Sequence, residues 1–351
     1  MSKFWSSMAK RTEPYIPGEQ VSRQDSIKLN TNENPYPPSP AVITAISKEM
    51  ERGLQLYPSP TANELCQKIG QVYGLAPEEV FVGNGSDEVL AFSFMAFFEP
   101  GKKIRFPSVT YSFYPVYAKL FDIPFEEIPL HEDFSVPIKR FYQSEGGVIL
   151  PNPNAPTSLY KELDQIEAII QNNPDQVVII DEAYIDFASG SAIELVAKYD
   201  NLLVIQTTSK SRSLAGLRVG FALGNKTLID ALVRIKDSFN SYTLDRLALV
   251  GAKAALEDQV YFKKTTEMII KTRQKTSDML TTLGFNILPS QANFLFVTHA
   301  TVPAEMIYGQ LKEAGIIVRH FNKPPIDNYL RITIGTDEQM GKLVEKLKEI
   351  I

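Results

Sequence analysis

The sequence has little cysteine and little histidine. Its 351 residues include one cysteine, Cys66, which excludes a disulfide within the chain and is typical of a protein from a reducing compartment. The three histidines, His131, His299 and His320, are widely scattered along the chain. We therefore expect neither a Cys/His cluster nor any other metal site.

Long apolar runs and an excess of positive charge are also missing. The longest nearly apolar run, Val89 to Phe98, is about half the length that crosses a bilayer, and the N-terminal residues lack the apolar core of a secretory signal. The chain carries 41 acidic and 36 basic side chains, a formal net charge of −5, which disfavours nucleic acid as a partner. These features predict a cytoplasmic protein that binds neither membrane nor nucleic acid.

The composition and length are those of a soluble globular protein of about two domains. Hydrophobic residues make up 44% and charged residues 22% of the chain. Residues 1–27 are mixed polar without a period, and we predict an N-terminal arm there. We predict a large α/β domain over residues 28–249 and a small α+β domain, joined by the arm, over residues 250–351.

Short β-rich runs recur along the predicted large domain, with segments capable of forming helices between most of them. The runs lie at residues 80–83, 102–106, 147–150, 176–181, 201–206 and 218–224. Strands that alternate with helices predict βαβ units and a mostly parallel sheet. The tail predicts short strands around a helix near residues 303–314, followed by a closing helix over residues 337–350.

Polar side chains follow two of these predicted strands. Asp181 comes directly after one buried strand and Lys210 follows the next, at a separation typical of one strand–helix–strand unit. Ligands of open parallel sheets bind outside the carboxyl ends of the strands. If the two strands are neighbours, a carboxylate and an amine therefore lie at one rim of the sheet.

An amine and a carboxylate at one rim suit a phosphorylated aldehyde cofactor. The amine can form a Schiff base, and the carboxylate can keep a heterocyclic nitrogen protonated, as pyridoxal phosphate requires. A phosphate also needs amides at a helix start, hydroxyls and a guanidinium. These groups are available from Gly85, Ser86, Asp87, Thr207, Ser209 and Arg218. Each part alone has an ordinary structural interpretation, such as a helix cap or a solvated charge, and only the combination is specific.

Seven segments carry a resemblance to a known family: LNTNENPYP, LYPSP, GNGSDE, NPNAPT, IIDEAYIDF, TTSKSRSLAGLRVG and YLRITIGT. They resemble the pyridoxal-phosphate-dependent aminotransferases of the aspartate-aminotransferase fold, and most closely the class II histidinol-phosphate aminotransferases. The resemblance covers nearly the whole chain. It implies fold type I, with a mostly parallel seven-stranded sheet, helices on both of its faces, and a smaller α+β domain.

The resemblance assigns roles to the matching positions. Lys210 would form the Schiff base with the cofactor, Asp181 would pair with its ring nitrogen, and Tyr184 would bind its ring hydroxyl. Tyr111 would stack on the ring, although it could equally be a core aromatic residue, like its neighbours. The phosphate would be held by Gly85, Ser86, Asp87, Thr207, Ser209 and Arg218. Tyr57 would reach the phosphate of a partner subunit, which implies a homodimer.

One position departs from the family pattern. The family usually has asparagine immediately before the Pro-Thr of the NPNAPT segment, where it binds the ring hydroxyl, but this chain has Ala155. Either Asn154 or Asn152 supplies that bond, or Tyr184 makes it alone. Of these we favour Asn154.

The resemblance also implies the substrates. Arg331, with Arg319 and Tyr15 of the arm, would bind the anionic groups of histidinol phosphate and of 2-oxoglutarate in turn, and the products would be imidazole acetol phosphate and glutamate. Threonine-phosphate decarboxylases and aromatic or broad-range aminotransferases share nearly all of these motifs. A ligand-binding module without catalysis is a more remote alternative. A nicotinamide-dependent oxidoreductase would need a third glycine in GNGSDE.

Overall fold

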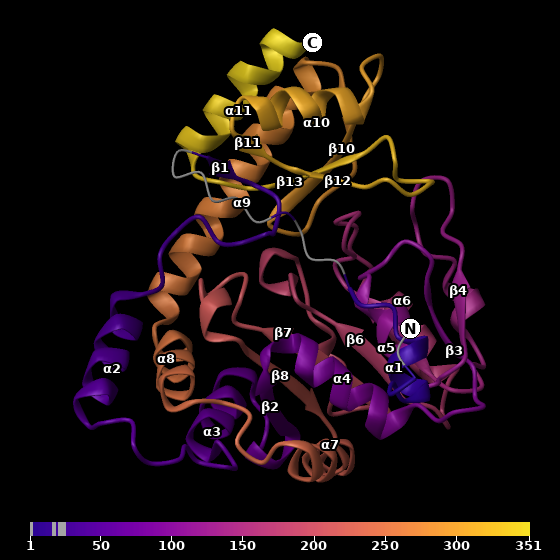
Figure 1. Ribbon diagram of the computed structural model, residues 1–351, viewed down its shortest axis with the longest axis vertical. Coiled ribbons are helices and arrows are strands. Elements are labelled where there is room, and N and C mark those ends of the chain that lie inside the picture. The colour runs from indigo at the N-terminus through magenta and orange to yellow at the C-terminus, as the bar shows by residue number, and fades with distance from the viewer. Residues whose placement is uncertain (1–2, 16–18, 20–25) are drawn as a thin grey trace.

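The computed structural model describes residues 3–15, 19 and 26–351, which form a large domain and a smaller one (Figure 1). Helix α9 (Gln259–Thr282) leads from the large domain to the small one. Residues 1–2, 16–18 and 20–25 of the predicted arm lie outside the described residues.

The large domain is built on a seven-stranded sheet. Strand β8 runs antiparallel to both of its neighbours, and the other pairs are parallel. The strand order is β2 (Val80–Asn84), β8 (Val219–Gly224), β7 (Leu202–Thr207), β6 (Val178–Asp181), β5 (Val148–Pro151), β3 (Ile104–Pro107) and β4 (Phe125–Ile128). The predicted fold class is confirmed, although no apolar run in the sequence marks β4.

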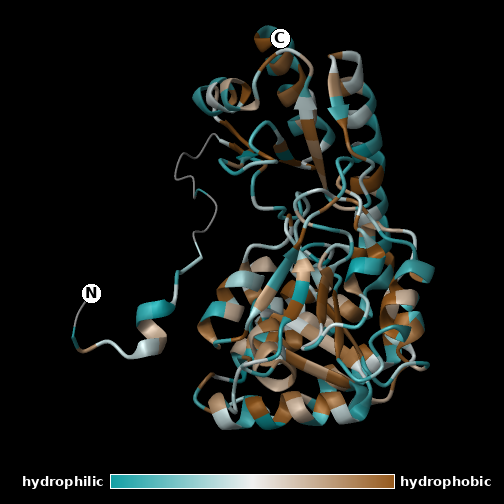
Figure 2. Cartoon of the chain, turned by 90° about the vertical axis from the view of Figure 1, so that its right-hand side faces the viewer, coloured by the Kyte–Doolittle hydropathy of each residue, from teal (hydrophilic) through white to brown (hydrophobic). Residues whose placement is uncertain are grey.

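Helices cover both faces of this sheet, which explains why its central strands β6 and β7 are apolar up to their carboxyl ends. In β6, Val178 and Ile180 join the core on one face and Ile179 joins the core on the other. The first face is covered by α2 (Pro40–Glu51), α3 (Asn63–Tyr73), α6 (Leu163–Gln171) and α8 (Arg246–Glu257). The second face is covered by α4 (Gly85–Phe97), α5 (Phe113–Leu120) and α7 (Lys226–Phe239). Figure 2 shows these hydrophobic strands inside the domain.

The small domain has an antiparallel sheet of four strands and a short parallel pair. The sheet order is β12 (Arg319–His320), β13 (Leu330–Thr333), β10 (Phe294–His299) and β9 (Phe285–Ile287). The parallel pair is β1 (Ile27–Lys28) with β11 (Ile316–Ile317). Helices α10 (Ala304–Glu313) and α11 (Asp337–Ile350), together with α9, share one hydrophobic core with these strands. Single 3-10 turns occur at η1 (Pro77–Glu79), η2 (Ile138–Phe141), η3 (Ile185–Phe187), η4 (Ala192–Leu195) and η5 (Ala215–Leu217).

The domain boundary predicted between residues 249 and 250 falls inside α8. Because α8 packs on α2 and α3, it lies with the large domain, and the chain crosses between the domains along α9. The predicted arm contains a short helix, α1 (Ser7–Arg11), that its sequence does not indicate. Among the described residues, no helix combines the length and the apolar character needed to cross a membrane.

Candidate active site

Asp181 and Lys210 line one cavity at the carboxyl ends of β6 and β7. These strands are parallel neighbours, with Asp181 paired to Ile205, as the spacing of the two residues predicts. The polar residues of this cofactor cavity are Ser86, Asp87, Tyr111, Asp181, Tyr184, Thr207, Ser209, Lys210 and Arg218. The structure thus brings together most of the residues that the sequence singles out.

One end of the cofactor cavity is built to receive an anion. No side chain caps the start of α4, so the amides of its first turn are not taken up by a cap. Gly85 has φ +81°, and a Cβ there would lie 2.4 Å from Arg218 Nη2, so glycine is required for the guanidinium to come this close. Thr207 Oγ1 lies 2.9 Å from Ser209 Oγ at the same end. Amides, hydroxyls and a guanidinium form a donor set that suits a phosphate.

The other end is acidic and buried. Asp181 is 5% exposed and accepts hydrogen bonds from Tyr114 Oη at 2.8 Å and from the Ala183 amide at 3.3 Å. Burial raises the pKa of Asp181 to about 6, against the opposing effect of these two donors. Tyr114 is a core residue of α5, and the sequence does not single it out as a functional residue.

The LNTNENPYP segment supports the lysine and the tyrosine from the side of the small domain. Lys210 Nζ donates to the Thr31 carbonyl at 3.2 Å, and Asn34 donates to the Lys210 carbonyl at 2.9 Å. Asn32 donates to Tyr184 Oη at 3.0 Å. The density of asparagine is the only sequence signal for these contacts.

Tyr111 lies between the cofactor cavity and a second, adjoining cavity, and it lines both. Its hydroxyl donates to Asp87 Oδ1 at 2.7 Å, and Arg218 donates to the other oxygen of the same carboxylate at 3.1 Å. Asp87 therefore ties the aromatic residue to the guanidinium.

The structure does not place Asn154 in the lining of the cofactor cavity, and its bond to the ring hydroxyl stays a prediction. Its amide donates instead to the Val109 carbonyl at 3.1 Å and to Thr157 Oγ1 at 2.8 Å. Asn152 is also turned away and donates to the Lys161 carbonyl. Pro151, Pro153 and Ala155 line the cavity, so alternate residues of this turn face it and the asparagines between them do not. Of the three candidates for the bond to the ring hydroxyl, only Tyr184 lines the cofactor cavity, and Asn32 donates to its hydroxyl.

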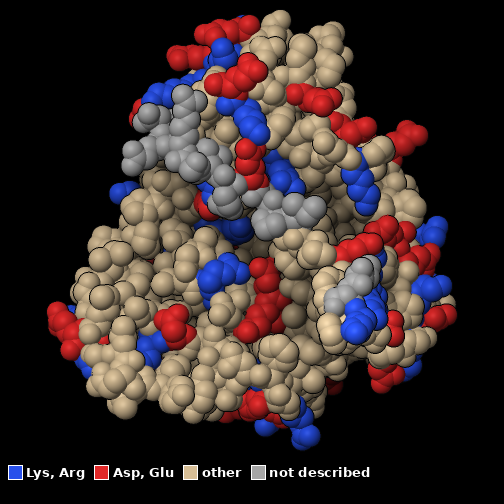
Figure 3. Space-filling view, viewed as in Figure 1, with Lys and Arg blue, Asp and Glu red and all other residues tan. Residues whose placement is uncertain are grey.

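The adjoining substrate cavity is lined by three predicted residues, Tyr15, Arg319 and Arg331, and shares Lys210 with the cofactor cavity. Arg331 Nη2 donates to the Asn30 carbonyl at 2.8 Å, but its Nε is buried without a partner among the described residues. Burial lowers the pKa of Arg331. A buried guanidinium with a free donor indicates an anionic ligand. Figure 3 shows Lys and Arg side chains in the hollow between the two domains.

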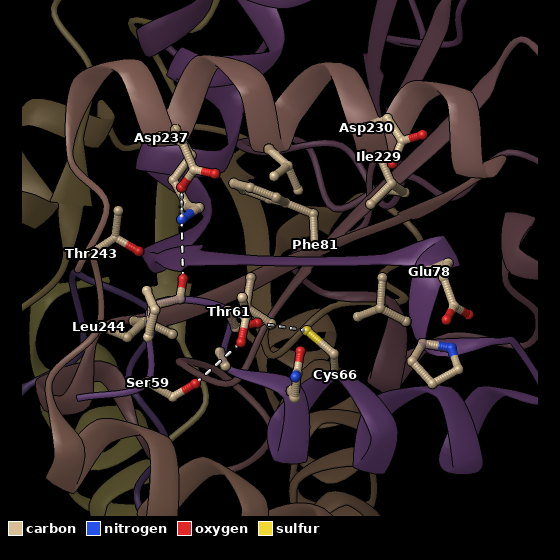
Figure 4. A pocket seen from close by; sticks show the side chains of 18 residues that line it. Ser59, Thr61, Cys66, Glu78, Phe81, Ile229, Asp230, Asp237, Thr243 and Leu244 are labelled. Carbon is tan, nitrogen blue, oxygen red and sulfur yellow. Dashed lines mark hydrogen bonds and ion pairs between the residues drawn. The ribbon is translucent and has the colours of Figure 1, made fainter.

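Tyr57 is remote from both of these cavities. It is 81% exposed and stacks on Tyr242, with ring centroids 4.8 Å apart. A further cavity, between α3, α7 and β2, contains none of the predicted site residues (Figure 4). Cys66 lines that cavity, and burial raises the pKa of its thiol to about 12, which makes it unreactive. The described residues include no group of three or more His, Cys, Asp or Glu side chains placed to hold a metal ion.

The profile of the class I and II aminotransferases matches residues 24–347, and the chain belongs to this family. It is 62% identical over 351 residues to histidinol-phosphate aminotransferase 1 of Oceanobacillus iheyensis, covering 100% of this chain and 99% of that protein. It is 55% identical to the histidinol-phosphate aminotransferase of Clostridium acetobutylicum, with 100% of both chains covered. Within the family, the chain thus belongs to the histidinol-phosphate aminotransferases, which confirms the resemblance carried by the motifs.

Solved structures agree with the fold. A histidinol-phosphate aminotransferase from Sinorhizobium meliloti, in complex with pyridoxal-5'-phosphate, superposes with a TM-score of 0.89 at 24% identity, covering 100% of this chain and 98% of that one. Aspartate aminotransferase from Thermus thermophilus with maleate gives a TM-score of 0.82 at 19% identity, with 100% of both chains covered. At these identities the likeness establishes the fold alone, which is the predicted fold type I.

Proposed function

We propose that this protein transfers the amino group of L-histidinol phosphate to 2-oxoglutarate, with pyridoxal phosphate as cofactor. The products are imidazole acetol phosphate and L-glutamate, and the reaction belongs to histidine biosynthesis. One observation carries the proposal: the Lys210 amine and the Asp181 carboxylate line one cavity, which adjoins a second cavity lined by Arg319 and Arg331.

The cofactor cavity fits pyridoxal phosphate at both ends. The first amides of α4, with Thr207, Ser209 and Arg218, would hold the phosphate, and Asp181 would hold the ring nitrogen. When bound, pyridoxal phosphate supplies an aldehyde that condenses with amines and a protonated ring that withdraws electrons.

The residues of the chain then divide the work. Asp181 keeps the ring nitrogen protonated, and Tyr114 fixes the orientation of that carboxylate. Lys210 Nζ binds the cofactor between turnovers and takes the proton from Cα of the substrate. Tyr184 binds the ring hydroxyl, and its own hydroxyl is held by Asn32. Tyr111, which lines the same cavity, would pack on the ring.

The two arginines explain how one cavity serves two different acids. A guanidinium binds a carboxylate or a phosphate through two parallel charge-assisted hydrogen bonds. Arg331 and Arg319 would therefore bind the phosphate of the first substrate and a carboxylate of the second, with Tyr15 beside them.

We place the enzyme in the cytoplasm as a homodimer with composite sites. Tyr57 lies on the surface and contributes to neither cavity of its own chain, and its hydroxyl would bind the cofactor phosphate of the partner subunit.

The proposal is tested with the purified protein and its Lys210→Ala variant. With histidinol phosphate and 2-oxoglutarate, we expect glutamate to form without carbon dioxide, and a near-visible absorbance band that changes when histidinol phosphate is added. Lys210→Ala is expected to lose that band and at least about 10³-fold in kcat. The exposed Lys226→Ala variant is the matched control. Release of carbon dioxide, or full activity of Lys210→Ala, contradicts the proposal.

A further inference from the structure

The segment that carries Tyr57 is an exposed loop without regular secondary structure. This Tyr57 loop, residues 53–61, joins α2 to α3 and presents Leu54, Leu56 and Tyr57 to solvent. A loop of this kind loses conformational freedom when it meets a partner, which weakens binding unless the loop is already ordered. The contacts that order it are therefore of functional interest.

The start of the Tyr57 loop is held by Arg246 of α8. Arg246 Nη1 donates to the Gly53 carbonyl at 2.9 Å, and its Nε donates to Glu49 Oε1 at 2.7 Å. The side chains of Arg246 and Glu49 are only 17% and 8% exposed. The ion pair with Arg246 lowers the pKa of Glu49, so the carboxylate stays charged. This pair fixes the guanidinium that holds the loop.

The end of the Tyr57 loop is held by Lys236 of α7. Its ammonium donates to the Pro60 carbonyl at 3.1 Å and to the Ser241 carbonyl at 3.3 Å. The side chain is 8% exposed and lies at the edge of the cavity shown in Figure 4, next to Asp237. A buried lysine that bridges two backbone carbonyls fixes the distance between the two segments.

The middle of the loop is held by the stack of Tyr57 on Tyr242, whose ring planes are 25° apart. Tyr242 lies between Ser241 and Arg246 in the chain. The beginning and middle of the Tyr57 loop thus contact residues 241–246 directly. The end of the loop is attached through Lys236, which also binds the Ser241 carbonyl.

We propose that Arg246 and Lys236 are positioning residues that hold Tyr57 outward in the conformation that binds the cofactor phosphate of the partner subunit. This inference rests on the proposed function, which gives Tyr57 that role. Neither cation lines the cofactor cavity or the substrate cavity of its own chain, so each acts through the loop. They make the loop rigid before the subunits meet, and the cofactor is then bound without a further cost of ordering.

The test is a double-mutant cycle on the full-length dimer. Arg246→Met and Lys236→Met are each made in the wild-type protein and in Tyr57→Phe, and cofactor-free protein is titrated with pyridoxal phosphate to give a dissociation constant. We expect Tyr57→Phe to weaken cofactor binding about tenfold, the loss of one charge-assisted hydrogen bond. Each cation variant is expected to weaken it about threefold to tenfold in the wild type and less than twofold in Tyr57→Phe. At saturating cofactor, the kcat of Arg246→Met and of Lys236→Met should change less than twofold relative to wild type.

Lys226→Met is the matched control, because Lys226 lies on the same helix as Lys236 and forms an exposed ion pair with Asp230. If a variant of the buried Arg246 or Lys236 fails to fold, Tyr242→Ala replaces it in the cycle. Tyr242 is 42% exposed and holds the middle of the loop through its stack with Tyr57. If Arg246→Met or Lys236→Met weakens cofactor binding equally in the wild type and in Tyr57→Phe, the inference is overturned while the role of Tyr57 stays intact. No effect of Tyr57→Phe overturns the role of Tyr57, and with it the inference.

Discussion

At Asp181, burial and hydrogen bonding act on the pKa in opposite directions. Burial disfavours the charged carboxylate, whereas Tyr114 Oη and the Ala183 amide donate to it and favour it. The net result is a pKa of about 6, raised from an ordinary value of 3.8. Without cofactor, the folded protein therefore holds this proton more tightly than the unfolded chain does. A cationic ring nitrogen beside the carboxylate would favour its charged form and so lower the pKa of Asp181 again.

This pKa predicts how the stability of the cofactor-free protein depends on pH. The stability that the neutral Asp181 carboxyl contributes is complete below about pH 4 and is lost as the pH rises through 6. The free energy of unfolding of wild type minus that of Asp181→Asn should therefore fall by about 2 kcal/mol between pH 4 and 6.5, because asparagine does not titrate. Urea unfolding of both proteins across this range measures the difference. Parallel curves would show that the carboxyl has an ordinary pKa.

The start of α4 and strand β8 form one unit because Gly220 lets them touch. A Cβ at Gly220 would lie 2.3 Å from the Ser86 amide nitrogen and 2.4 Å from the Gly85 carbonyl carbon. Both atoms belong to the backbone, so they cannot move aside as a side chain would. The position of the predicted phosphate site thus depends on a glycine that does not itself line the cofactor cavity.

Gly220→Ala should push β8 away from the start of α4. We expect a loss of about 1–3 kcal/mol of stability from the overpacking and cofactor binding at least about tenfold weaker, because the amides of Ser86 and Asp87 move. Thermal unfolding and cofactor titration measure the two effects. The matched control is Gly309→Ala in α10, where a Cβ meets nothing within 4 Å and alanine favours the helix. Cofactor affinity unchanged in Gly220→Ala would contradict the prediction.

The sequence predicts those elements whose signal is local. The strands around Asp181 and Lys210 follow from apolar runs, whereas β4 is an edge strand whose two glutamates, Glu126 and Glu127, leave no such run. The two central site residues were predictable because Asp181 ends one strand and Lys210 comes three residues after the end of the next. Asn32 and Tyr114 were not, because their bonds to Tyr184 and Asp181 span 152 and 67 residues of the chain and form only in the folded protein.

Across the whole molecule, the arm is attached to both domains. On the large domain, Arg11 donates to the carbonyls of Lys119 and Leu120, and Tyr15 stacks on Phe113 with centroids 4.3 Å apart. On the small domain, Glu19 forms an ion pair with Lys312 at 2.9 Å. Tyr15 lines the substrate cavity, and none of the described residues of the arm lines the cofactor cavity.

Deletion of residues 1–15 should therefore separate substrate binding from cofactor binding. We expect the KM for histidinol phosphate to rise about tenfold, because the lining of the substrate cavity loses Tyr15, while the dissociation constant of pyridoxal phosphate changes less than twofold. Steady-state kinetics and cofactor titration measure the two values. Glu13→Gln is the control within the arm, since its ion pair with Lys119 is exposed and contributes little. An unchanged KM would place Tyr15 outside the substrate site, and a loss of cofactor affinity would mean that the arm shapes the large domain itself.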